Sequence, residues 1–120
     1  MMDRDAAARA RARLLMLRAE RDRLERLLLR PAEVVRGSLV ERHLGTTASK
    51  RATACFYVSV PREGGGGKLT YVLKDDIERV RRGVAAYRER RTALRRLRAV
   101  HGELVTVFGE LLAAQEADAR

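Results

Sequence analysis

The chain has 120 residues and a formal net charge of +10, from 26 basic and 16 acidic residues. That length suits one domain with its own core, and the scarcity of aromatic residues (4%) indicates a core of leucine, valine and alanine. The single cysteine, Cys55, excludes an internal disulfide and a multi-cysteine metal site. No apolar run is long enough to span a membrane, so we expect a cytoplasmic protein without membrane contact.

The first predicted element is a long helix over residues 5–30. This stretch consists mostly of alanine, arginine, leucine and glutamate, which are strong helix formers, and Pro31 closes it. Its apolar residues recur at heptad spacing and therefore predict a seam that packs against another helix. The larger members of this seam are Leu14, Leu17, Leu24 and Leu28.

Residues 37–74 are predicted to form a β-hairpin module. Residues 55–60 and 69–73 alternate apolar and polar side chains, as half-buried strands do, and Gly64 to Gly67 form a flexible tip between them. Residues 38–44 are a further candidate strand, and residues 46–53 are predicted to form a loop.

The last predicted element is a long basic helix over residues 75–116. Asp75 and Asp76 suit its first turn, because the helix dipole favours negative charge there. We expect its seam to run through Leu94, Leu104 and Phe108, with a stammer in the heptad near residues 91–97.

The predicted fold is thus α+β. Two long coiled-coil-like helices flank a small two- or three-stranded antiparallel sheet within a single domain, residues 1–120. The two apolar seams pair either within one chain or between chains, and the sequence leaves both arrangements open. A homodimer is the expected assembly.

A cluster of arginines dominates the second helix. Between Arg79 and Arg98 there are nine arginines and one acidic residue, Glu89. Arginine binds phosphate through a planar, bidentate fork, and a broad basic helix face favours phosphate contacts over base readout. The alternative is a solvated helix face without a ligand. The candidate nucleic-acid-binding residues of the cluster are Arg79, Arg81, Arg82, Arg88, Arg95 and Arg96.

The central module adds four candidate cations: Lys50 and Arg51 in the predicted loop, and Arg62 and Lys68 beside the glycine tip. A basic hairpin of this kind can follow a nucleic-acid backbone, although glycine-rich tips are commonly simple turns. Tyr57 and Tyr71 have side chains that stack on bases, but tyrosines in strands more often serve packing.

The sequence offers no catalytic or metal-binding constellation. The run from Gly64 to Lys68 lacks the preceding glycine and the following Ser or Thr of a phosphate-binding loop. His43 and His101 have no cysteine or carboxylate at metal-ligand spacing, and nothing pairs Cys55 with a base. We therefore expect no cofactor, no metal and no enzymatic activity.

The run Arg36-Gly37-Ser38-Leu39-Val40-Glu41-Arg42, followed by the hairpin and by a helix with Ile77-Glu78-Arg79-Val80-Arg81-Arg82 and Tyr87-Arg88, resembles a family of small uncharacterised bacterial and archaeal proteins. The resemblance covers about residues 36–100 and implies a protein related to the DNA of mobile elements. The family's cysteine-rich loop is absent here, because residues 43–54 contain no cysteine, so no metal role is carried over.

Charge and pattern together predict a small non-enzymatic nucleic-acid-binding protein, with DNA favoured over RNA. The alternative function is that of a coiled-coil oligomerisation or adaptor protein, in which the apolar seams pair with another copy or with a helical protein. The cationic face then serves solubility or an acidic protein partner.

Overall fold

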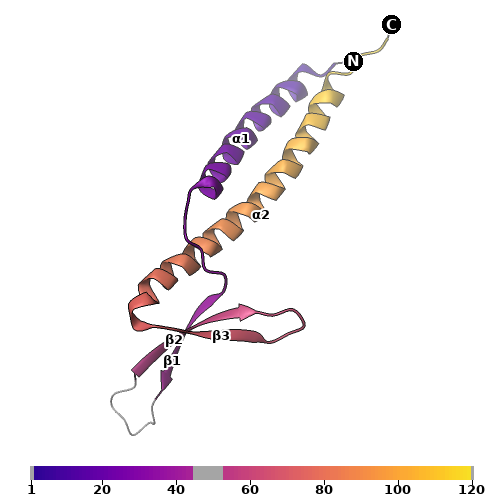
Figure 1. Cartoon of the computed structure of the whole chain (residues 1–120). Helices are drawn as coiled ribbons and strands as arrows, with labels where there is room; N and C mark the ends of the chain where they lie inside the picture. Colours follow the sequence, from indigo (N-terminus) through magenta and orange to yellow (C-terminus); the bar gives the residue numbers. More distant parts are fainter. Residues whose placement is uncertain (1, 45–52, 120) are drawn as a thin grey trace. The chain divides into compact units, whose positions relative to one another are not determined.

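A computed structural model describes residues 2–44 and 53–119 of the chain. Its elements in chain order are α1 (Arg4–Leu29), β1 (Ser38–Leu44), β2 (Thr53–Pro61), β3 (Gly67–Val72), a short 3-10 turn (Lys74–Asp76) and α2 (Ile77–Ala114) (Figure 1). The three strands form one antiparallel sheet in the order β1-β2-β3. The predicted α+β class is confirmed.

The chain divides into two compact units. Unit 1 comprises Met1–Pro31 and Arg90–Arg120, and unit 2 comprises Ala32–Glu89. Helix α2 takes part in both, because its residues 77–89 belong to unit 2 and its residues 90–114 to unit 1. The expected single domain over residues 1–120 stays a prediction.

Local signals set the limits of the helices. The Asp3 side chain caps α1 by accepting a hydrogen bond of 2.9 Å from the Ala6 N–H, and Pro31 follows the last turn. Asp75 and Asp76 lie in the 3-10 turn that precedes α2, so α2 begins two residues later than the sequence predicted. It then continues to Ala114 without a break.

Unit 1 is an antiparallel helical hairpin. At one end the Asp3 N–H donates to the Ala114 carbonyl at 2.8 Å, and at the other end the Arg90 guanidinium donates to the Arg30 carbonyl at 3.2 Å. Rising residue numbers in α1 therefore meet falling numbers in α2, as Figure 1 also shows. The two long helices pair within one chain.

The core of unit 1 lies along the contact between the helices. Leu17 and Val100 are its most deeply buried side chains, at 1% and 0% exposure. Of the seven residues expected in the seams, Leu14, Leu17 and Leu104 are buried, Leu24, Leu28 and Leu94 are half-buried, and Phe108 is 54% exposed. The members of the buried cluster are Ala10, Leu14, Leu17, Val100, Leu104 and Val107.

The seam of α2 differs in phase from the one expected. In unit 1 the buried positions of α2 are Ala93, Val100, Leu104 and Val107, which follow heptad spacing without a stammer. In unit 2 the helix buries Val80 and Val84 instead. Of the residues expected in this part of the seam, Leu104 is therefore in the core, whereas Leu94 lies at its edge and Phe108 lies outside it.

Unit 2 consists of the sheet and one helical segment that covers one of its faces. Side chains alternate between the two faces of a strand, and Val58 and Val72 point toward α2, where they form a buried cluster with Val80 and Val84. Phe56 and Val60 pack against the same cluster. The opposite face of the sheet carries Tyr57 and Tyr71.

Gly83 allows a close approach of the chain to α2. Its carbonyl accepts a hydrogen bond of 2.9 Å from the Val35 N–H. A Cβ atom at position 83 would lie 2.6 Å from Cγ2 of Val35 and 3.3 Å from its backbone nitrogen. At Gly102, in contrast, an added Cβ meets nothing within 4 Å.

The substitution Gly83→Ala is expected to destabilise the protein. Overpacking costs about 1–3 kcal/mol, which offsets or exceeds the gain of about 1 kcal/mol from replacing a helical glycine. Gly102→Ala is the matched control and is expected to raise stability, since only the propensity gain applies there. Urea unfolding followed by circular dichroism measures both; a more stable Gly83→Ala protein would contradict the close packing.

The substitution Leu17→Ala is expected to lower the free energy of unfolding by about 2–5 kcal/mol, because it leaves a cavity in the seam. Its neighbour Met16 is 69% exposed, so Met16→Ala is expected to change stability by no more than about 0.5 kcal/mol. Equal losses in the two variants would show that the helices do not pair along Leu17.

Candidate nucleic-acid interface

The open face of the sheet in unit 2 carries a row of side chains across all three strands. The strand register places Val40 of β1 opposite Tyr57 of β2, and Tyr57 opposite Tyr71 of β3. The two tyrosine rings meet edge to face, with centroids 5.6 Å apart and planes inclined by 70°. Such T-shaped pairs are a favoured aromatic geometry, so the two rings pack against each other on this face of the sheet.

Arg42 adds a positive charge beside the two tyrosines. The Arg42 guanidinium lies over the Tyr57 ring, 5.7 Å from its centroid, at a distance typical of a cation–π contact. Tyr71 stays 54% exposed, and its strand neighbour Leu69 is 41% exposed. We call Arg42, Tyr57 and Tyr71 the tyrosine platform.

The platform has the chemistry of a base-stacking surface. An exposed tyrosine ring stacks on any base, because every base has a π face, and an adjacent arginine contributes a further stacking plane or a phosphate contact. A sheet covered by a helix on one face, with aromatic side chains on the other, presents those rings to a single strand whose bases are unpaired.

The arginine cluster of the sequence is divided between the two units. Arg79, Arg81, Arg82 and Arg88 belong to unit 2, whereas Arg95 and Arg96 belong to unit 1. The arginines of each unit are therefore described separately.

In unit 2, Arg79 and Arg81 form ion pairs with acidic side chains. Arg79 forms ion pairs with Glu33 and Asp76. Arg81 lies 3.5 Å from a Glu78 carboxylate oxygen and over the Phe56 ring. These exposed pairs are worth little individually, so the guanidinium groups can exchange their partners for phosphate.

Arg88 lies beside Arg81. Its guanidinium donates a hydrogen bond of 3.3 Å to the Ser38 hydroxyl, and both arginines line an open hollow of about 240 Å³ with Leu39. Arg82 is exposed, and within the described part of the chain it forms no ion pair. Together these cations form the basic surface of unit 2.

In unit 1, Arg96 joins the two helices. It donates to both carboxylate oxygens of Glu20, with one contact at 2.9 Å, and to Glu103 at 3.1 Å. Glu103 also pairs with Arg13 at 3.0 Å. This network balances the charge of Arg96, so its position favours a role in helix pairing. Arg95 is exposed.

The contact between Glu20 and Arg96 shifts the pKa of both side chains. The hydrogen bond from Arg96, followed by weaker attraction from the surrounding arginines, holds the pKa of Glu20 below its ordinary value of 4.5. The same hydrogen bond raises the pKa of Arg96.

The remaining candidates lie in the hairpin module. Arg62 and Lys68 are exposed on either side of the β2–β3 turn, in which Gly64, Gly65 and Gly66 adopt positive φ angles. The Arg62 N–H closes this turn by donating to the Gly66 carbonyl at 3.0 Å. Lys50 and Arg51 lie outside the described residues.

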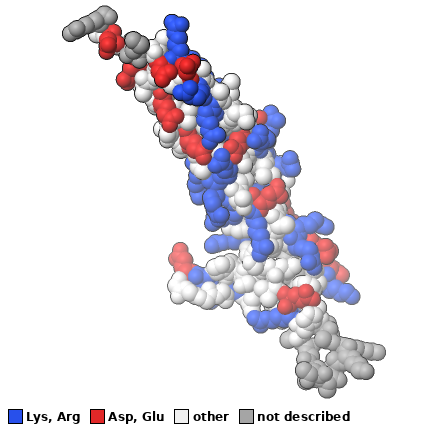
Figure 2. Space-filling view, turned by 180° about the vertical axis from the view of Figure 1, so that it is seen from behind, with Lys and Arg blue, Asp and Glu red and all other residues white. Residues whose placement is uncertain are grey.

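Acidic side chains accompany the basic ones. On the face of the molecule in Figure 2, red carboxylate residues lie among the blue arginines and lysines along the helices. A polyanion would therefore meet a mixed surface with a positive excess, which favours moderate and salt-sensitive binding.

No family model, curated protein or solved structure matches the chain. The family resemblance based on residues 36–100 accordingly stays a prediction. Within residues 2–44 and 53–119, no helix is long and apolar enough to cross a membrane, and no cluster of three potential metal ligands occurs.

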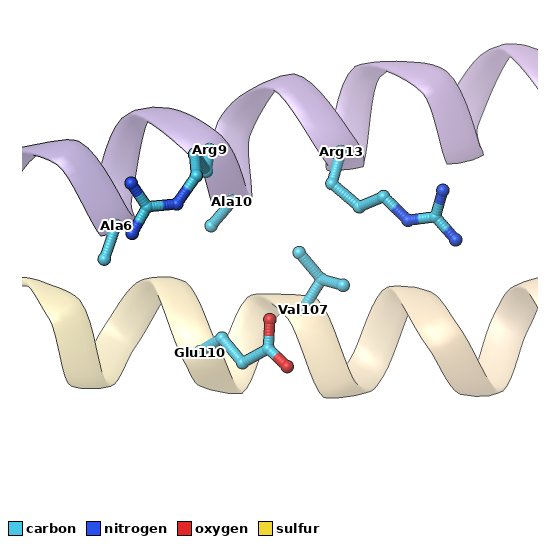
Figure 3. Close-up of a pocket in the computed structure, with 6 residues that line it drawn as sticks. All are labelled: Ala6, Arg9, Ala10, Arg13, Val107 and Glu110. Atoms are coloured by element: carbon cyan, nitrogen blue, oxygen red, sulfur yellow. The ribbon is translucent and has the colours of Figure 1, made fainter.

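Unit 1 has an open hollow between its helices. It encloses about 650 Å³ and is lined by Ala6, Arg9, Ala10, Arg13, Val107 and Glu110 (Figure 3). The alanines leave room between the helices, and the polar lining consists of two arginines and one glutamate. Such a lining offers charge contacts but no nucleophile with an adjacent base.

Arg42 is the candidate that the sequence missed. The sequence indicates the two tyrosines as possible stacking residues but places Arg42 only in a candidate strand. The signal that identifies it is the register between β1 and β2, which pairs Arg42 with Cys55, two residues from Tyr57.

The substitution Glu20→Gln is expected to destabilise the helical hairpin in a pH-dependent manner. Because the folded-state pKa of Glu20 is depressed, its ionised form stabilises the protein above pH 4.5, and this contribution is lost as the pH falls through the folded-state pKa. Thermal unfolding of the wild type and the variant between pH 3 and pH 7 should therefore give two curves that converge at low pH. Parallel curves would contradict the ion pair.

Proposed function

We propose that this chain is a small non-enzymatic nucleic-acid-binding protein that stacks unpaired bases on the tyrosine platform of unit 2. The observation that carries the proposal is the exposed Tyr71 ring, held edge to face against Tyr57 beside the Arg42 guanidinium. Aromatic stacking of this kind tolerates any sequence and supports binding of single strands.

The basic surface of unit 2 provides the phosphate contacts. Arg81 and Arg88 line one hollow, and Arg82 is exposed on the same helix. Contacts of this kind set affinity and its salt dependence without reading sequence. In unit 1, Arg95 is a candidate phosphate contact of its own, whereas Arg96 stabilises the helix pair.

This proposal refines the sequence-based hypothesis. A broad arginine face alone suits the phosphates of a duplex, whereas an exposed ring on a sheet, such as that of Tyr71, suits bases that are already unpaired. We therefore propose a single strand as the ligand, with DNA favoured over RNA by the resemblance based on residues 36–100.

The substitution Tyr71→Ala is expected to weaken binding of a labelled oligothymidylate by about 5- to 150-fold, which corresponds to the loss of one stacked base. Tyr71→Phe keeps the ring and should bind like the wild type. Fluorescence anisotropy at several salt concentrations measures both affinities, and the salt dependence should be the same for the wild type and Tyr71→Ala.

Replacing Arg42 by glutamine tests the cation of the platform, and Leu73→Ala provides an uncharged control, since the Leu73 side chain is 63% exposed. We expect Arg42→Gln to reduce both the affinity and the salt dependence, by a slope of about 0.7 if it contacts one phosphate of a single strand. Wild-type affinity in Tyr71→Ala, or preference for duplex over single strand, would refute the platform as the binding site.

A further inference from the structure

Helix α2 carries a second stripe in unit 1, apolar except for His101, beside the seam that pairs it with α1. The stripe consists of His101, Val105, Phe108 and Leu112, which follow one another in steps of four, three and four residues. Val105, Phe108 and Leu112 are 73%, 54% and 67% exposed. Heptad spacing is the pattern of a helix-packing face, and within the described chain this face has no helix packed on it.

The surroundings of the stripe are unusual in a chain with 35% charged residues. Between residues 99 and 109 of α2 the only charged side chain is Glu103, which is engaged with Arg13 and Arg96. The outer surface of the helix is therefore largely uncharged here.

An apolar groove adjoins the stripe. It has a volume of about 270 Å³ and is lined by Leu14, Leu15 and Phe108 together with Arg11 and Arg18. Leu15 is 67% exposed. A side chain from a helix laid along the stripe can enter this groove and bury Leu15 together with Phe108.

The charges that border the stripe identify the occupant. On its N-terminal side α2 carries the exposed Arg91, Arg95 and Arg98, and on its C-terminal side the exposed Glu116 and Asp118 follow the helix. Two copies of this segment placed antiparallel bring the basic end of each opposite the acidic end of the other. A parallel arrangement would bring like charges together, which is destabilising.

We propose that the His101–Leu112 stripe is the contact face of an antiparallel homodimer, in which α2 of one copy packs on α2 of the other near Val105. Because α1 of each copy packs on its own α2, this contact produces a four-helix bundle that consists of one helical hairpin from each copy. The proposal concerns unit 1 alone and is independent of the tyrosine platform.

The substitution Val105→Asp tests this contact. The wild type is expected to sediment with a mass near twice the 13.5 kDa of the chain, and Val105→Asp is expected to weaken dimerisation by at least about 100-fold, because the variant buries unpaired charges at the contact. Met16→Asp is the matched control: Met16 is 69% exposed but points about 100° further around α1 than Leu15, and it should leave the dimer intact.

A charge exchange tests the orientation. Arg95→Glu and Glu116→Arg should each weaken the dimer several-fold, and the double variant should restore it toward the wild-type affinity. Circular dichroism checks that every variant keeps its helices. A monomeric wild type at high concentration, a dimeric Val105→Asp protein, or a charge exchange that restores nothing would overturn the proposal.

Discussion

The pairing of α1 with α2 along Leu17 and Val100 is the contact on which the rest of unit 1 depends. Both side chains are almost completely removed from water, and burial of this kind is the main driving force for helix association. The ion pairs of Arg96 with Glu20 and Glu103 also join the helices, and because these side chains are partly exposed they add less stability than the buried seam.

Helix α2 contributes buried side chains to two separate cores. Its first part buries Val80 and Val84 against the sheet, and its second part buries Val100 and Leu104 against α1. Arginine is suited to the remaining surface because its long aliphatic stem covers apolar area while its head group stays in water. The arginine-rich composition thus serves the packing of the helix as well as any polyanionic ligand.

Much of the fold could be predicted from the sequence, because the signals were local. Helix formers before Pro31, the alternation around Tyr57 and the glycines at 64–67 indicated the elements within a few residues. The phase of the seam in α2 could not be predicted, since Leu94 and Phe108 fit a heptad spacing as well as the residues that the core uses. The partners of Arg96 and the position of Arg42 over Tyr57 depend on tertiary pairing, which no local pattern records.

The division of unit 1 into two separate stretches of chain affects the order in which the protein folds. Leu17 and Val100 meet only after the intervening residues have closed a long loop, and the entropy lost in loop closure grows with the length of the flexible segment. The strands of unit 2 pair with near neighbours in sequence, so their contacts form quickly. Once the sheet has formed, the effective loop is shorter, and the seam between the helices closes at a lower entropic cost.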